Sequence, residues 1–177
     1  MIDFEALAIE ERPQASRIAE WMAAQHSGLS VLDVGCGPGL YVDEMRARGV
    51  EAFGIDNDPR LVEAEHLWCA DLLKMPSADH FDIVMSLEVG EHLFESQSRP
   101  FVRVLAEHAQ DFIYFSAAQP GQGGAGHYNC QPKGYWVERF AELGWKLDQE
   151  RTDVWLGWMK NGPHMGWLIN NGMVFGR

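Results

Sequence analysis

Short apolar runs alternate with amphipathic stretches along the whole chain. The apolar runs predict β-strands over residues 29–34, 51–55, 66–70, 81–87, 112–116, 145–147 and 167–175. Apolar positions at helical spacing predict α-helices over 15–22, 41–45, 101–108, 134–143 and 153–159, and the capping sequence 57–59 predicts one more short helix. Gly49 and Gly144 follow two of these helices, as is typical of helix C-termini.

Strands that alternate with helices indicate βαβ units. The pattern therefore predicts an α/β fold with a doubly wound, mostly parallel sheet in three α/β/α layers. Such sheets bind ligands beyond the carboxyl ends of their strands, at the point where the strand order reverses. Because no internal repeat or linker-like tract interrupts the pattern, we expect residues 1–177 to form a single domain.

Composition narrows the class of protein. With 46% hydrophobic and 23% charged residues, the chain is typical of a globular protein, and no apolar run approaches the roughly 20 residues of a membrane span. Three widely spaced cysteines without metal-finger spacing suit a reducing compartment, so we expect a cytoplasmic protein that does not enter the membrane. A net charge of −12 disfavours nucleic acid as a partner.

A glycine-rich turn links the first predicted strand to a helix, in the sequence Asp33-Val-Gly35-Cys-Gly37-Pro-Gly39. Glycines let the backbone turn sharply and let a ligand approach it without a Cβ in the way. Asp56 ends the next strand, where a carboxylate can accept both hydroxyls of a ribose. Asp71 follows the third predicted strand and is placed to contact an adenine amino group. Together these features indicate a nucleoside-containing cofactor.

This arrangement resembles the class I S-adenosylmethionine-dependent methyltransferases over nearly the full chain. The resemblance implies a seven-stranded sheet whose last strand, 167–175, is antiparallel. It also implies that the turn holds the methionine end of the cofactor, Asp56 the ribose, and Asp71 and Leu72 the adenine. The candidate cofactor-binding residues are Asp33, Gly35, Cys36, Gly37, Gly39, Asp56, Asn57, Asp71, Leu72 and Leu87. The G-x-G-x-G spacing differs from the dinucleotide pattern, which makes a nicotinamide enzyme a distant second interpretation.

A polar cluster, Glu88-Val-Gly-Glu91-His92, follows the fourth predicted strand. If a helix begins near Glu88, the three ionisable side chains share one face, and their oxygen and nitrogen atoms would suit Mg²⁺ or Mn²⁺. The E-x-x-E-H pattern resembles two metal-dependent branches of the family. These are the ubiquinone-pathway O-methyltransferases and the enzymes that methylate the 2′-hydroxyl at the 3′ end of small RNAs. His127 could take the place of the further histidine found in the RNA branch.

A metal-free interpretation stays open, because many family members carry Glu-His-Leu here without a metal. The acidic group then complements a helix N-terminus, and His127 or His92 is the natural general base. The candidate catalytic residues are therefore His127, His92 and Glu88, and the candidate metal ligands are Glu88, Glu91, His92 and His127.

Two further segments could contribute to an acceptor site. Residues 119–131 contain four glycines within six positions and form either a lid over the cofactor or a flexible surface loop. A second cluster, Trp155, Trp158, His164, Met165 and Trp167, could line an acceptor pocket, or could be core or a dimer contact.

The function predicted from these features is methyl transfer from S-adenosylmethionine to an unidentified acceptor, with a hydroxyl oxygen preferred on the acidic pattern at 88–92. A small metabolite, a sugar or an exposed group on a larger molecule would all fit. Two alternatives remain: a metal-free N-methyltransferase and a non-catalytic module that binds S-adenosylmethionine. The oligomeric state is not determined by the sequence.

Overall fold

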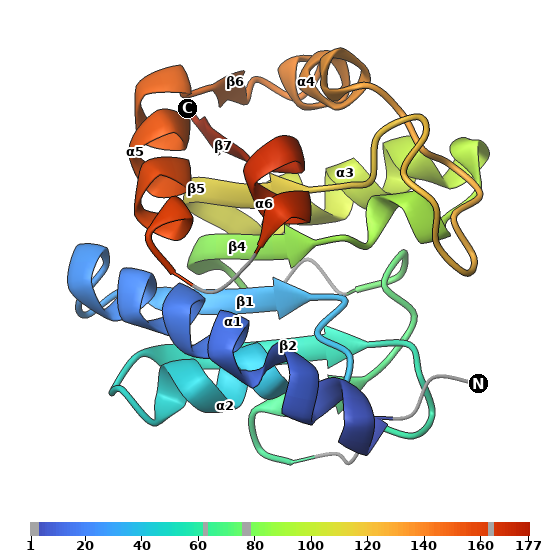
Figure 1. The fold of residues 1–177 in the computed structure, drawn as a ribbon. Coiled ribbons are helices and arrows are strands. Elements are labelled where there is room, and N and C mark those ends of the chain that lie inside the picture. Colours follow the sequence, from blue (N-terminus) through green and yellow to red (C-terminus); the bar gives the residue numbers. More distant parts are fainter. Residues whose placement is uncertain (1–3, 62–63, 76–78, 163–164) are drawn as a thin grey trace.

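The computed structural model describes residues 4–61, 64–75, 79–162 and 165–177, with side chains from residue 12 onward. Seven strands form one sheet in the order β3-β2-β1-β4-β5-β7-β6 (Figure 1). The strands are β1 (Ser30–Val34), β2 (Glu51–Asp56), β3 (Leu67–Cys69), β4 (Phe81–Leu87), β5 (Ala109–Ser116), β6 (Lys146–Leu147) and β7 (Met173–Gly176). Only β7 runs antiparallel to its neighbours, β5 and β6, so the predicted mixed sheet is confirmed.

Helices cover both faces of the sheet in three layers (Figure 1). The helices are α1 (Phe4–Gln25), α2 (Leu40–Arg46), α3 (Ser98–His108), α4 (Lys133–Ala141), α5 (Gln149–Lys160) and α6 (Gly166–Asn171), with 3-10 turns η1 (Gly90–His92) and η2 (Glu95–Gln97). One hydrophobic cluster joins α1, α2, α5 and α6 to one face, and a second joins α3 and α4 to the other. The doubly wound α/β/α architecture follows from this division.

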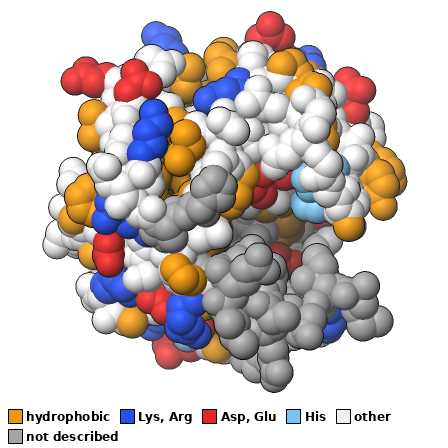
Figure 2. Space-filling view, in the orientation of Figure 1, with side chains coloured by type: hydrophobic (Ala, Val, Ile, Leu, Met, Phe, Trp, Pro, Cys, Tyr) orange, Lys and Arg blue, Asp and Glu red, His pale blue; other side chains and the backbone are white. Residues whose placement is uncertain are grey.

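The strand order reverses between β1 and β4, which places a ligand-binding crevice at their carboxyl ends. In Figure 1 these ends lie on the right, where the segments after β1, β4 and β5 gather. Figure 2 shows that the surface is hollowed there and that histidine and acidic side chains stand at the rim. The fold therefore brings three separate loops to one place.

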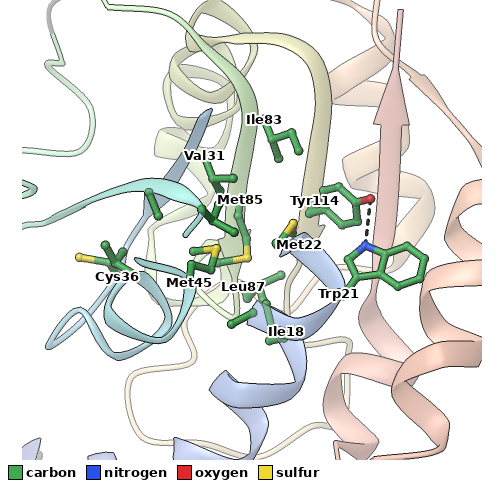
Figure 3. Packing of buried hydrophobic residues seen from close by; sticks show 14 of the residues in the cluster. Ile18, Trp21, Met22, Val31, Cys36, Met45, Ile83, Met85, Leu87 and Tyr114 are labelled. Carbon is green, nitrogen blue, oxygen red and sulfur yellow. Dashed lines mark hydrogen bonds between the residues drawn. The ribbon is translucent and has the colours of Figure 1, made fainter. Parts of the chain in front are cut away.

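The core holds the strands that carry those loops. On one face Ile18 and Met22 of α1 pack with Met45 of α2 against Val31 and Met85 of the central strands, all five side chains being fully buried (Figure 3). Burying a large apolar side chain contributes about 1.5–3 kcal/mol. Packing of this density fixes β1 and β4 side by side, so the loops that follow them are anchored at one end.

Two predicted elements differ from the structure. The strand predicted over 167–175 is wrong in its first half: residues 166–171 form α6, and β7 begins only at Met173. Leu168 and Asn171 are buried at helical spacing, and Gly172 ends the helix. The helix predicted from 57–59 is replaced by a turn over the described residues 57–61, the neighbouring residues 62–63 lying outside the description.

That turn has a local cause. The Asp56 carboxylate accepts a hydrogen bond from the Asp58 N–H at 2.8 Å, and the Asp58 carboxylate accepts one from the Arg60 N–H at 2.9 Å. Side-chain bonds of this kind compete with helix formation. They hold the segment after β2 close to the carboxyl end of the sheet.

The tryptophan cluster near the C-terminus packs as core. Trp155 is fully buried beneath Tyr114, and Trp158 and Trp167 pack against the same hydrophobic cluster. This favours the core interpretation over an acceptor pocket, although His164 lies outside the described residues. Along the described part of the chain, no helix has the length and apolar content to cross a membrane.

Candidate functional site

The glycine turn after β1 adopts backbone conformations that favour glycine. Gly35, Gly37 and Gly39 have φ values of 85°, 55° and 86°. A Cβ added to Gly35 would lie 2.4 Å from Val89 Cγ2, so the turn packs directly against the segment after β4. A Cβ added to Gly37 would meet nothing within 4 Å. The middle of the turn is thus open to a ligand while its start is closed by protein.

Two carboxylates stand beside this turn. Asp33 is buried, its Oδ2 has no hydrogen-bond partner within the described residues, and burial together with the charge of Asp56 raises its pKa to about 8. Asp56 accepts hydrogen bonds from the N–H groups of Gly37 at 2.7 Å and of Asp58 at 2.8 Å. A buried carboxyl oxygen without a partner fits a cationic group, such as the amino group of a methionine moiety.

The predicted adenine side is more exposed. Asp71 binds Lys74 Nζ at 2.9 Å and the Leu73 N–H at 3.0 Å, and the bond to Lys74 lowers the pKa of the Asp71 carboxyl. The remaining predicted cofactor residues are Leu72, Leu87 and Cys36, all buried, and Asn57, which is exposed. The cofactor contacts of these residues stay predictions.

The polar cluster after β4 has a different shape from the one predicted. Glu88 is not helical: its φ is 55°, and it is the one non-glycine residue of the described chain with a positive φ. Its N–H donates to the Ser116 carbonyl at 3.0 Å, which continues the contact between β4 and β5. The 3-10 turn η1 begins two residues later at Gly90. The prediction that Glu88 shares a helical face with Glu91 and His92 is therefore wrong.

The structure brings Glu91, His92 and His127 together instead. One ligand atom from each lies within 4.8 Å of the others, and the two imidazole rings meet edge to face at 4.9 Å. Glu88 is not a member of this group. Its carboxylate contacts the side-chain amides of Gln122 and Asn171, and its charge still acts on Glu91 and His92.

The two histidines are oriented in the same way. His92 Nδ1 lies 3.1 Å from the Gly126 carbonyl oxygen, and His127 Nδ1 lies 3.3 Å from that of Gln122. A carbonyl can only accept, so each Nδ1 donates and each Nε2 keeps its lone pair. A backbone partner on one ring nitrogen is the usual support for a histidine that binds a metal through the other. It equally prepares Nε2 to act as a base.

The charges in this cluster favour a bound cation. Glu91 is fully buried and neither of its carboxyl oxygens has a hydrogen-bond partner in the described structure. Burial, and next the charge of Glu88, raise the pKa of Glu91 to about 8. Burial and the neighbouring His127 lower the pKa of His92, which keeps that ring neutral. A buried carboxyl without partners beside imidazole nitrogens fits a divalent metal ion.

Comparison with known proteins decides the family. Residues 7–150 match the family model described as a methyltransferase domain. The chain belongs to the S-adenosylmethionine-dependent methyltransferases. This methyltransferase thus carries the glycine turn after β1 together with the acidic and histidine cluster after β4.

Among curated proteins, the methyltransferase is similar to ubiquinone biosynthesis O-methyltransferases. The protein from Bradyrhizobium sp. (strain ORS 278) is 32% identical over 78 residues, which is 38% of this chain and 31% of the relative. The protein from Cereibacter sphaeroides (strain ATCC 17029) is 33% identical over 79 residues, or 37% and 32%. The match therefore spans about a third of the length of these relatives.

Solved structures share the fold of the methyltransferase at low identity. The magnesium protoporphyrin IX methyltransferase from Synechocystis PCC 6803, solved with bound S-adenosylhomocysteine, has a TM-score of 0.72 at 15% identity and is covered to 88% by the whole chain. An amino pentose methyltransferase of calicheamicin biosynthesis from Micromonospora echinaspora has a TM-score of 0.72 at 14% identity, with 98% covered by the whole chain. These likenesses establish the class I fold.

Sequence reasoning missed three residues that the structure places at the site of the methyltransferase. Val89 packs on the donor turn, and the side chains of Gln122 and Asn171 bind Glu88. Gln122 lies in the glycine-rich loop, which the sequence did single out, but no sequence pattern predicted the contacts of its side chain. No local signal marked Asn171, because its surroundings were predicted to be a strand.

Proposed function

We propose that this chain transfers the methyl group of S-adenosylmethionine to a hydroxyl oxygen. The observation that carries this proposal is the contact between Gly35 of the donor turn and Val89, which adjoins the Glu91, His92 and His127 cluster. A methyl donor in the turn would thus face polar groups that can hold and deprotonate an acceptor. The similarity to O-methyltransferases of ubiquinone biosynthesis supports oxygen as the methylated atom.

The donor half of the site is built from carboxylates and open backbone. Bound S-adenosylmethionine would supply an electrophilic methyl group on a sulfonium. Asp33 would pair with the amino group of the methionine moiety, and Asp56 would accept the ribose hydroxyls. The adenine would lie between Asp71 and Leu72. Each role follows from an available oxygen or apolar side chain at the carboxyl end of a strand.

The acceptor half contains the histidine cluster. Glu91, His92 and His127 would hold a divalent cation, with oxygen and nitrogen ligands that suit Mg²⁺ or Mn²⁺. A cation bound there would lower the pKa of an acceptor hydroxyl. Carbonyls of the 119–131 loop lie at Nδ1 of both rings, which would leave each Nε2 to bind the cation, and Glu91 is buried so that bulk water does not compete for it.

A metal-free reaction is the second candidate. The lowered pKa of His92 favours its neutral form, which is the form a general base needs, and the Nδ1 contact of His127 would leave its Nε2 to face an acceptor. In this case the acceptor could be a hydroxyl or an amine, and Glu91 would carry the proton that its raised pKa retains.

Calorimetry separates the two candidates. Mn²⁺ is titrated into chelator-treated protein that is saturated with S-adenosylhomocysteine. Stoichiometric binding that is lost in Glu91→Gln and kept in Glu95→Gln, an exposed acid of the neighbouring turn, would establish the metal site. Absence of specific binding would favour His127 or His92 as the base. Failure of S-adenosylhomocysteine itself to bind would overturn the whole proposal.

The acceptor is then sought with labelled S-adenosylmethionine and paired hydroxyl and amine compounds of the same skeleton. Transfer to the hydroxyl member of a pair supports the proposed oxygen specificity, and transfer to the amine member alone refutes it. Tight cofactor binding without turnover on any pair would favour a non-catalytic binding module.

A further inference from the structure

Three polar side chains from distant parts of the chain contact one another. Glu88 directly follows β4, Gln122 lies in the glycine-rich loop, and Asn171 is the last residue of α6. Asn171 Nδ2 lies 3.0 Å from Glu88 Oε1, 3.2 Å from Glu88 Oε2 and 2.9 Å from Gln122 Oε1. Gln122 Nε2 donates to Glu88 Oε2 at 2.8 Å. The Glu88 carboxylate is thus held by two carboxamides.

Two of these residues are fixed by the fold. Asn171 is buried, and its Oδ1 accepts from Gln119 Nε2 at 3.2 Å. The next residue, Gly172, offers its carbonyl to Lys133 Nζ at 2.8 Å, which ties the junction of α6 and β7 to α4. Glu88 is anchored through its N–H to Ser116 of β5. Neither can move without disturbing the sheet.

Gln122 stands on a different kind of segment. Gly121 and Gly123 flank it, and a Cβ on either would meet nothing within 4 Å, so the backbone there has freedom and space. On its N-terminal side this stretch is also held by Gln119, whose carbonyl accepts from the Gln122 N–H at 3.0 Å and whose side chain donates to Asn170 and Asn171. The bonds of Gln122 to Glu88 and Asn171 connect this glycine-rich stretch of the loop to residues that the fold holds in place.

The same loop carries His127. The Gln122 carbonyl accepts from His127 Nδ1, and the Tyr128 and Asn129 N–H groups bond the Glu91 carbonyl at 2.8 and 3.0 Å. The side chain of Gln122 thus hydrogen-bonds Glu88, while the backbone carbonyl of Gln122 orients His127. The residue that ties the loop to Glu88 therefore also contacts His127 of the histidine cluster.

We propose that Gln122 is a positioning residue: its carboxamide latches the 119–131 loop onto Glu88 and Asn171, and so sets His127 beside His92 and Glu91. Asn171, buried at the end of α6, is the fixed residue to which the loop is bound. This inference rests on the proposed function for its purpose, since it concerns the site that would receive the acceptor. In this proposal Glu88 holds the loop in place, and Glu91, His92 and His127 bind the cation.

The test measures amide hydrogen exchange in the full chain saturated with S-adenosylhomocysteine. Gln122→Ala removes the latch, and Asn171→Asp replaces the amide donor with a carboxylate of the same shape that repels Glu88. In both variants the Tyr128 and Asn129 amides should exchange at least roughly tenfold faster than in the parent chain. Gln131→Ala is the matched control, because the Gln131 side chain bonds Asn129 of its own segment at 3.0 Å and, among the described residues, makes no hydrogen bond to Glu88 or Asn171.

Mn²⁺ affinity gives a second readout. It should fall at least about tenfold in Gln122→Ala and hold in Gln131→Ala, with S-adenosylhomocysteine affinity kept within about threefold in both. Unchanged exchange in Gln122→Ala overturns the latch, even if Asn171→Asp does not fold. If the parent chain binds no Mn²⁺, the metal part of the proposed function fails, while the exchange comparison still decides the latch.

Discussion

Gly35 and Val89 approach each other so closely that no side chain fits between them. A Cβ on Gly35 would lie 2.4 Å from Cγ2 and 2.9 Å from Cγ1 of Val89. This contact joins the turn after β1 to the segment after β4, which would carry donor and acceptor respectively. Methyl transfer needs the reacting atoms in line and about 3 Å apart, so the spacing between these two loops matters directly for the reaction.

Gly35→Ala should therefore weaken S-adenosylhomocysteine binding at least roughly tenfold, because the new methyl collides with Val89 and the positive φ disfavours alanine. Calorimetry measures the loss. Gly28→Ala is the control, since Gly28 has a φ of 82° and open space around it. Val89→Ala in the Gly35→Ala background should recover part of the affinity. No recovery would mean that backbone strain alone is responsible.

Alanine substitutions at the neighbouring residues Gly124 and Gly123 form a second variant and its matched control. A Cβ on Gly124 would lie 2.2 Å from His127 Nε2, whereas one on Gly123 would meet nothing within 4 Å. Gly124→Ala should push the His127 ring out of the cluster and lower Mn²⁺ affinity at least about tenfold. Gly123→Ala should bind Mn²⁺ like the parent chain. Equal affinities in the two variants would contradict a role for His127 as a ligand.

The raised pKa of Asp33 predicts that cofactor binding depends on pH. With a pKa of about 8, Asp33 is mostly protonated at pH 7 in the free protein, and pairing with an amino group requires its ionised form. S-adenosylhomocysteine should bind roughly tenfold more tightly at pH 8.5 than at pH 6.5, with release of a proton at the lower pH. Asp33→Asn should bind more weakly and lose this dependence. A variant with the parental pH dependence would show that another group titrates.

In the metal-free protein, Glu91 should lower the free energy of unfolding. The unfolded chain releases the Glu91 proton near pH 4.5, but the folded chain holds it up to a pKa of about 8, so stability falls as pH rises between these values. Glu91→Met should raise the free energy of unfolding by about 2 kcal/mol at pH 7 and by less at pH 5, while abolishing Mn²⁺ binding. Urea unfolding at both pH values checks this. A gain of equal size at the two pH values would point to packing alone.

His26 provides a pH effect of opposite sign, far from the site. It is buried, its Nε2 lies 2.7 Å from the Tyr114 hydroxyl, and burial lowers its pKa from 6.5 to about 4. The unfolded chain takes up the proton first, so stability is lost as pH falls from 6.5 toward 4, by at most roughly 3 kcal/mol. His26→Gln should flatten this loss in urea unfolding between pH 7 and pH 5. An unchanged slope would assign the acid sensitivity to other groups.

The sequence by itself determined the class of fold and the glycine turn of the candidate donor site. The turn from Gly35 to Gly39 lies within five residues of one strand end, and local backbone requirements specify it without help from the rest of the chain. Apolar periodicity likewise located the central strands, because β1 and β4 are buried along nearly their whole length. The predicted cofactor contacts of Asp33, Asp56, Asn57, Asp71 and Leu72 rest on the same local logic.

Only the tertiary structure decided the acceptor side. Spacing alone suggested a helical face for Glu88, but its N–H continues the contact between β4 and β5, and its positive φ breaks the helical spacing to Glu91 and His92. The pairing of β7 with β5 then carries Asn171 to Glu88, 83 residues earlier in the chain. Contacts of this range depend on strand order and helix packing, which no local pattern records. The donor turn is a property of a short segment, whereas the acceptor site is a property of the whole sheet.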